Sequence, residues 1–180
     1  GRQRRSAGCK VLRGDGRIDI TTRISRTFLR LKENSETGFI AYVTAGDPDL
    51  KTSEALVLEL EQRGVDIVEL GVPFSDPMAD GTVNQASAQR ALLHNVSLLD
   101  VLAMVERLRA RTDLPIVLFT YYNPVHHMGL EAFADRVADA GVDGVLALDL
   151  PPEEAGDYKR LLNRGGLDTI FLVAPTSREH

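Results

Sequence analysis

Two carboxylates in the segment VELGVPFSDPMADG, residues 68–81, are placed where they could move protons. Glu69 lies inside an apolar run that is typical of a buried strand, and Asp80 follows in a loop that also contains Asp76. Burial disfavours the charged form of a carboxylate and raises its pKa, which makes a general acid or base effective near neutral pH. Two acids in different surroundings can handle two different protons of one substrate. The pattern therefore favours acid–base catalysis by Glu69 and Asp80.

Each of these side chains also has a structural interpretation. A buried glutamate such as Glu69 can satisfy a backbone group or pair with a basic residue, although its apolar flanks contain no such partner. Aspartates in loops, such as Asp76 and Asp80, commonly form turns or cap helices. On the residues alone, both interpretations stay open.

The elements that would position these carboxylates follow a repeating pattern. From Gly38 onward, short apolar runs alternate with amphipathic stretches. The runs are nearly uncharged and rich in Val, Ile, Leu or aromatic residues, as expected for strands covered on both faces. Strands and helices that alternate with short connections predict an α/β fold with a parallel sheet. The expected strands are residues 39–44, 67–70, 116–121, 145–150 and 170–174, and the expected helices are residues 52–63, 84–93, 97–111, 131–140 and 151–164.

Glu69 is expected at the C-terminal end of the second strand. In parallel α/β folds the loops that follow the strands form the active face, whereas the loops that precede the strands serve stability. Side chains alternate along a strand, so Ile67 and Glu69 point to one face, and Val68 and Leu70 to the other. The segments expected on the active face are residues 44–48, 71–82, 121–129, 149–154 and 174–177.

The overall composition limits the class of protein. With 180 residues, of which 43% are hydrophobic, the chain is long enough to bury a core. The single cysteine, Cys9, excludes an intramolecular disulfide and a cysteine metal cluster. No apolar run approaches the roughly 18 residues of a membrane span, so we expect no membrane partner and a cytoplasmic location.

The net charge of −5 conceals a basic N-terminal segment, because residues 1–32 contain ten Lys or Arg and two Asp. Such a segment can be a nucleic-acid arm, an organelle transit peptide or a solvated extension. We expect a disordered extension at residues 1–22, followed by a single domain at residues 23–180. The acidic remainder has no basic stripe, which argues against nucleic acid as the main ligand.

Five stretches carry a resemblance to a known family. They are GFIAYVTAGDPD (residues 38–49), VDIVELGVPFSDPMADG (65–81), PIVLFTYYNP (115–124), AGVDGVLALDLPPEE (140–154) and IFLVAPTS (170–177). In order and spacing they resemble the alpha subunit of tryptophan synthase, over residues 24–178. The resemblance implies a (β/α)8 TIM barrel. This sequence contains about the first five β/α units and lacks the C-terminal part, including the loops that bind the substrate phosphate.

The family cleaves indole-3-glycerol phosphate to indole and glyceraldehyde 3-phosphate, a retro-aldol step of tryptophan biosynthesis. By position, Glu69 matches the acid/base that protonates the indole ring and assists loss of the hydroxyl proton. Asp80 matches the acid that hydrogen-bonds the indole nitrogen. Each residue of the indole pocket could equally belong to the barrel core. The residues that the resemblance places in this pocket are Tyr42, Phe119, Tyr121 and Leu146.

The resemblance also implies a protein partner. In the family a beta subunit, which contains pyridoxal phosphate, receives the indole, so no cofactor is expected in this subunit. The residues that match the loop contacting the beta subunit are Pro73, Asp76 and Pro77. Thr82 stands where the family usually has a proline after ADG, and this change is expected to loosen the loop that carries Asp80.

Other hypotheses compete with this one. A truncated paralogue or fragment without catalysis could at most dock on the beta subunit through the Asp76 loop. Another phosphate-using barrel, such as an aldolase or isomerase, is disfavoured because no lysine lies at a strand end for a Schiff base. The adjacent His126 and His127 do not have the spacing of metal ligands on a helix, so no metal site is expected.

Overall fold

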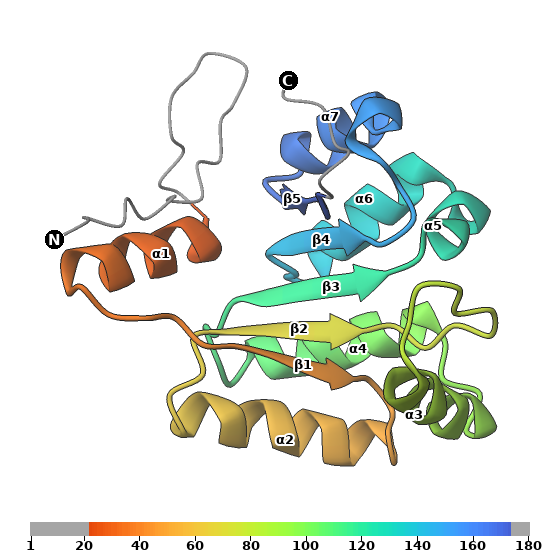
Figure 1. The fold of residues 1–180 in the computed structure, drawn as a ribbon, viewed down its shortest axis with the longest axis horizontal. Coiled ribbons are helices and arrows are strands. Elements are labelled where there is room, and N and C mark those ends of the chain that lie inside the picture. Colours follow the sequence, from red (N-terminus) through yellow and green to blue (C-terminus); the bar gives the residue numbers. More distant parts are fainter. Residues whose placement is uncertain (1–21, 174–180) are drawn as a thin grey trace, which may run out of the picture.

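A computed structural model describes residues 22–173 of the chain, and a sheet of five strands forms its centre (Figure 1). The strands lie in sequence order, and each one pairs in parallel with the strand before it. They are β1 (Ile40–Thr44), β2 (Ile67–Gly71), β3 (Ile116–Thr120), β4 (Gly144–Ala147) and β5 (Asp168–Ile170). The α/β class and the parallel sheet expected from the alternating apolar runs are confirmed.

The helices begin at residues that favour helix starts. In α2 (Leu50–Gln62) the N-cap is Asp49, whose carboxylate accepts a hydrogen bond from the Thr52 backbone N–H at 2.7 Å. In α4 (Leu98–Arg109) Ser97 and Asp100 form a capping box. The remaining helical segments are α1 (Arg23–Glu33), α3 (Thr82–Leu93), α5 (Tyr122–Met128), α6 (Leu130–Asp139), the 3-10 turn η1 (Pro152–Glu154) and α7 (Gly156–Arg164).

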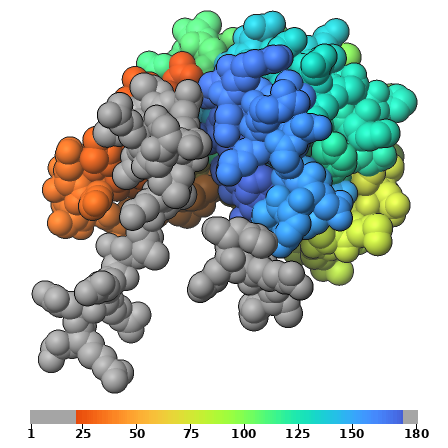
Figure 2. Space-filling model, turned by 90° about the horizontal axis from the view of Figure 1, so that it is seen from above, coloured from red at the N-terminus to blue at the C-terminus, as the bar shows by residue number. Residues whose placement is uncertain are grey.

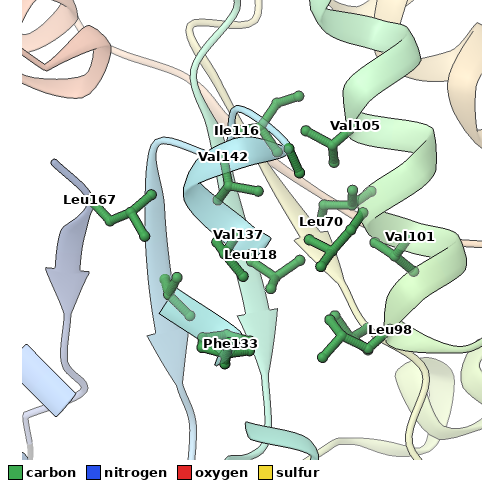
Figure 3. Close-up of a cluster of buried hydrophobic side chains, with 14 of the residues drawn as sticks. Leu70, Leu98, Val101, Val105, Ile116, Leu118, Phe133, Val137, Val142 and Leu167 are labelled. Carbon is green, nitrogen blue, oxygen red and sulfur yellow. The ribbon is translucent and has the colours of Figure 1, made fainter. Parts of the chain in front are cut away.

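One face of the sheet packs against the helices and holds the main core. Leu70 of β2 and Leu118 of β3 lie in this core with Val101 and Val105 of α4 and Phe133 of α6 (Figure 3). All five side chains are buried. Full burial of a side chain of this size contributes about 1.5–3 kcal/mol. This core therefore holds the helical layer on the sheet and fixes the sheet that carries the candidate site.

The opposite face of the sheet carries a smaller apolar cluster. Ile67, Val117 and Leu146 form it together with Ile24 and Phe28 of α1. In Figures 1 and 2, α1 (orange) lies at one end of the molecule and the loop after β2 (yellow) at the opposite end. Because α1 packs near the amino ends of the strands, their carboxyl ends lie away from it.

A buried ion-pair network joins α1 and α4 to the amino end of β4. The Asp143 side chain is 4% exposed and accepts hydrogen bonds from Arg109 at 2.5 Å and from Arg23 at 3.0 Å. Its carboxylate also accepts from the Ile116 backbone N–H at 2.8 Å. Arg109 donates in addition to the Leu114 carbonyl at 2.7 Å. Since all these groups lie before the strands, on the end that serves stability in such folds, the network is structural.

The segment after β3, expected to be a loop, is mostly helical. It forms α5, and the backbone N–H of Tyr122 at its start donates to the Asp149 carboxylate at 2.6 Å. Asp149 lies after β4, so this contact ties the loop after β4 to the segment after β3, as expected for an aspartate that joins loops rather than handles protons. His126 and His127 are exposed on α5. Among residues 22–173, no group of three or more His, Cys, Asp or Glu side chains could hold a metal ion.

Three other expected boundaries were wrong. β4 ends at Ala147 rather than at residue 150, because the chain turns there. β5 spans Asp168–Ile170 rather than residues 170–174, and it starts earlier because the Asp168 N–H donates to the Asp143 carbonyl at 2.9 Å. The helix expected at residues 151–164 is divided into η1 and α7, because Ala155 between them has a non-helical backbone, with φ −88° and ψ 13°.

Two expectations fall largely outside the described part of the chain. These are the extension at residues 1–22, of which only Thr22 is described, and the loop at residues 174–177. Thr22 is the N-cap of α1. Within residues 22–173, no helix combines the length and the apolar character that a membrane crossing requires.

Candidate active site

The carboxylate of Glu69 and the ring of Tyr42 lie side by side on neighbouring strands. Tyr42 of β1 is the register partner of Glu69 of β2. Gly71, two residues further along β2, is the partner of Phe119 of β3, which in turn pairs with Leu146 of β4. Adjacent partners in a parallel sheet point to the same face. These side chains therefore lie on the face of the sheet whose amino end is covered by α1. The sheet thus brings together four of the predicted site residues.

Glu69 is half-buried, and no cation lies beside it in the part of the chain that the structure describes. Among residues 22–173 the structure contains no hydrogen bond or ion pair to its carboxylate, so the interpretation as a salt-bridged structural glutamate is not supported. Burial raises the pKa of Glu69 above its ordinary value. A carboxyl group whose pKa is raised by burial, and which has no partner within residues 22–173, is suited to general acid–base chemistry.

Asp80 is held in place by Tyr121. The Tyr121 hydroxyl donates to Asp80 Oδ2 at 2.9 Å and accepts from the Ala79 backbone N–H at 2.9 Å. The Tyr121 ring also lies 5.0 Å from the Phe74 ring, centroid to centroid. From the other side, Gln85 of α3 donates to the Asp80 carbonyl at 2.8 Å. These contacts fix the direction of the carboxylate and tie its loop to Tyr121 and α3, while the loosening expected from Thr82 stays a prediction.

The Tyr42 ring lies over β2 at the carboxyl end of the sheet. It meets the Phe119 ring edge-on, with centroids 5.1 Å apart and an interplanar angle of 75°. Burial raises the pKa of the Tyr42 hydroxyl, and the charges of Asp80 and Glu69 raise it further. The phenol therefore stays protonated at neutral pH, close to both carboxylates.

Gly71 makes room for this ring, and we expect Gly71→Ala to displace it. A Cβ at residue 71 would lie 2.2 Å from the Tyr42 hydroxyl oxygen and 2.7 Å from its Cζ. Overpacking of this kind destabilises a protein by about 1–3 kcal/mol. Urea denaturation of the full-length variant measures the loss. In a Tyr42→Ala background the clash is absent, so an equal loss there would contradict the explanation.

The residues expected at the partner interface differ in exposure. Pro73 is buried, Pro77 is half-buried and Asp76 is exposed, so only the last two present side-chain surface. Met78 in the same loop is 88% exposed. Pro73 is therefore better suited to shaping the loop than to contacting another protein.

Three residues of the site were not singled out from the sequence. Thr44 and Ser87 hydrogen-bond each other at 2.7 Å beside Tyr42, and Gly71 lies beneath it. A glycine at the end of a strand signals a close approach, so Gly71 had a usable signal. Ser87 is one of several small residues in α3, and nothing in its local sequence points to β1.

Parallel β/α units in sequence order, with acids at the carboxyl ends of the strands, define the first part of a (β/α)8 barrel protein. A family model described as tryptophan synthase alpha chain matches residues 28–180. The chain belongs to this family.

Sequence relatives agree with this assignment. The chain is 55% identical over 158 residues to the tryptophan synthase alpha chain of Geobacter sulfurreducens, covering 88% of this chain and 60% of that protein. It is 51% identical over 157 residues to that of Geotalea daltonii, covering 87% of this chain and 60% of that protein. The chain thus spans about 60% of the length of the curated relatives that it matches.

Solved structures share the fold. Tryptophan synthase subunit alpha from Legionella pneumophila superimposes with a TM-score of 0.85 at 41% identity, covering 88% of this chain and 61% of that chain. A chain of the tryptophan synthase complex from Pyrococcus furiosus gives a TM-score of 0.75 at 39% identity, covering 78% of this chain and 58% of that chain. The five-stranded sheet is therefore the first part of their barrel.

Proposed function

We propose that this protein cleaves indole-3-glycerol phosphate to indole and glyceraldehyde 3-phosphate, the lyase reaction of the tryptophan synthase alpha subunit in tryptophan biosynthesis. The observation that carries the proposal is the half-buried Glu69 in the middle of β2, which has no hydrogen bond or ion pair within residues 22–173 and lies beside Tyr42 and near Asp80. Family membership supports the same reaction.

The two carboxylates divide the proton transfers between them. Protonated Glu69 delivers its proton to the ring carbon that bears the side chain, and the positive charge that develops on the indole nitrogen is stabilised by Asp80. The Glu69 carboxylate then takes the proton of the adjacent side-chain hydroxyl. The carbon–carbon bond breaks, its electron pair returns to the ring, and the hydroxyl oxygen becomes an aldehyde. Glu69 ends protonated, as it began, so protons and electrons balance.

The apolar groups beside the carboxylates would bind the indole. Tyr42 and Phe119 offer ring surface at the carboxyl end of the sheet, where an aromatic ligand gains from burial. Leu146 is buried in the smaller apolar cluster and supports Phe119 from β4. The ring of Tyr121 would contribute to the pocket, and its hydroxyl group hydrogen-bonds the Asp80 carboxylate.

A beta subunit is the proposed partner, and the exposed loop of Asp76 and Pro77 is the proposed contact. The solved tryptophan synthase complex of Pyrococcus furiosus contains a chain with this fold, which supports the partner. In this proposal pyridoxal phosphate stays with the beta subunit, this subunit needs no cofactor, and the location is cytoplasmic. A docking protein without catalysis is the alternative.

Release of indole from indole-3-glycerol phosphate by the full-length protein, measured with and without a beta subunit, tests the proposal. We expect release in both assays and faster release with the partner. A folded protein that binds the beta subunit but releases no indole in either assay would favour the docking alternative.

We expect Asp80→Asn to lower kcat by about 10²-fold, because a neutral amide stabilises the positive indole nitrogen much less than a carboxylate does. The Tyr121 hydroxyl can still donate to the amide oxygen, so the loop should keep its structure. Steady-state kinetics of the full-length variant measure the effect, with Asp135→Asn on the exposed side of α6 as the control. Unchanged turnover would return Asp80 to the role of a turn former.

A further inference from the structure

Three hydroxyl groups form a chain that ends at the candidate site. Ser87 Oγ of α3 lies 2.7 Å from Thr44 Oγ1 of β1, and Thr44 Oγ1 lies 3.4 Å from the Tyr42 hydroxyl oxygen. Thr44 and Ser87 are 7% and 8% exposed. Ser87 Oγ also lies 2.9 Å from the Asn84 carbonyl oxygen, which can accept its proton. The chain therefore runs from a buried helix position to the phenol.

The Tyr42 hydroxyl has a proton to offer. Among residues 22–173 its one hydrogen-bond partner is Thr44, and when Thr44 donates to it, the phenol proton is free for a ligand. The oxygen lies directly over Gly71, two register pairs beyond Glu69 toward the carboxyl end of the sheet. Tyr42 and Glu69 are register partners on the same face of the sheet, so a ligand bound on this face can contact both groups.

The chain has two proton arrangements. If Ser87 donates to Thr44, then Thr44 donates to Tyr42, and Tyr42 is free to donate to a ligand. If Ser87 donates to the Asn84 carbonyl, Thr44 donates to Ser87, and Tyr42 can donate to Thr44 and accept from a ligand. The phenol can thus act as an acceptor for one form of a ligand oxygen and as a donor for another.

We propose that the Tyr42 hydroxyl, oriented by Thr44 and Ser87, hydrogen-bonds the substrate oxygen that changes from hydroxyl to aldehyde. The inference rests on the proposed function and adds Tyr42 to Glu69 and Asp80 as a third polar group that acts on the substrate. The substrate hydroxyl gives its proton to Glu69, the oxygen gains negative charge, and the bond between the ring and the side chain breaks as the carbonyl forms. Tyr42 donates to that oxygen without losing its proton, so the balance of the step is unchanged.

This donor acts mainly after substrate binding. A hydroxyl oxygen and a phenol interact modestly, whereas an oxygen that is losing its proton is a much stronger acceptor. Tyr42 should therefore affect kcat more than KM. Thr44 and Ser87 do not touch the substrate in this scheme and are positioning residues.

The test compares Tyr42→Phe with wild type in the full-length protein. The ring is kept and only the oxygen is lost, so we expect kcat for indole-3-glycerol phosphate to fall roughly tenfold or more, with KM changed much less. Binding of the analogue in which hydrogen replaces both side-chain hydroxyls should not change, because it lacks the oxygen that Tyr42 recognises. Tyr122→Phe, which removes a phenol oxygen from α5, is the matched control and should keep wild-type kcat.

A second pair of variants tests the orientation by Thr44. Thr44→Val keeps the side-chain shape and removes the hydroxyl, so kcat should fall, whereas Thr44→Ser keeps the hydroxyl and should retain most of the activity. A Tyr42→Phe variant with wild-type kcat, or one that weakens binding of the dideoxy analogue equally, would overturn the inference and leave the proposed function standing. A wild-type protein without turnover would overturn both.

Discussion

Replacing Glu69 by glutamine is expected to lower kcat for indole-3-glycerol phosphate cleavage by about 10³-fold or more, because the amide can neither deliver nor take a proton. Glutamine has nearly the same shape, and the structure gives Glu69 no ion pair within residues 22–173 that the change could break. The expected loss is therefore one of chemistry and not of folding. Single-turnover kinetics of the full-length variant measure it.

The stability of the Glu69→Gln variant provides the control. Burial raises the pKa of Glu69 in the folded protein, so the folded state binds this proton more tightly than the unfolded state does. The associated stability is present below the unfolded pKa and is lost as the pH rises through the folded pKa. Glutamine is neutral throughout, so near pH 7 the variant should be at least as stable as wild type. Near-normal turnover in a folded variant would refute the proton-transfer role.

Replacing Asp143 by alanine is expected to destabilise the protein by about 3–5 kcal/mol, because it removes one partner of a buried ion pair. Arg109 is 12% exposed and would be left without its 2.5 Å contact to a carboxylate. The Ile116 backbone N–H would also lose its acceptor. Since α1 is tied to the sheet by Arg23 and Asp143, the variant should also loosen this helix.

Urea denaturation of the full-length protein measures this loss as a shift in midpoint at an unchanged slope. Asp113→Ala is the matched control, because Asp113 is 93% exposed and contacts the same Arg23 from the solvent side. Exposed pairs contribute little, so the control should denature close to wild type. A similar midpoint for both variants would show that burial does not decide the strength of this network.

The order of the elements followed from the sequence because the local signals agreed with one another. The apolar run at Ile67 and the Ser97 capping motif each needed only nearby residues to be recognised. The helical α5 was not predicted, since its first backbone N–H donates to Asp149, which follows β4 in the sequence. The early start of β5 likewise depends on a bond to Asp143, which sequence proximity does not suggest.

The candidate site could be predicted only in part. Glu69 was found because side chains alternate along a strand, and the resemblance placed Asp80, Tyr42 and Phe119 near it. The contacts of Tyr121 with Asp80, and of Ser87 with Thr44, join residues about forty positions apart and follow from the packing of α3 and the loop on the sheet. The roles assigned to these residues in catalysis stay predictions until the variants are assayed.

The pairing of each strand with the one before it bears on how the protein forms during synthesis. Among residues 22–173, every new β/α unit can dock on a sheet edge that has already left the ribosome, so none of these strand pairings waits for a distant segment. The order of translation then becomes the order of assembly. Tyr42 and Glu69 come together first, and Phe119 and Leu146 are added to them as the later strands arrive.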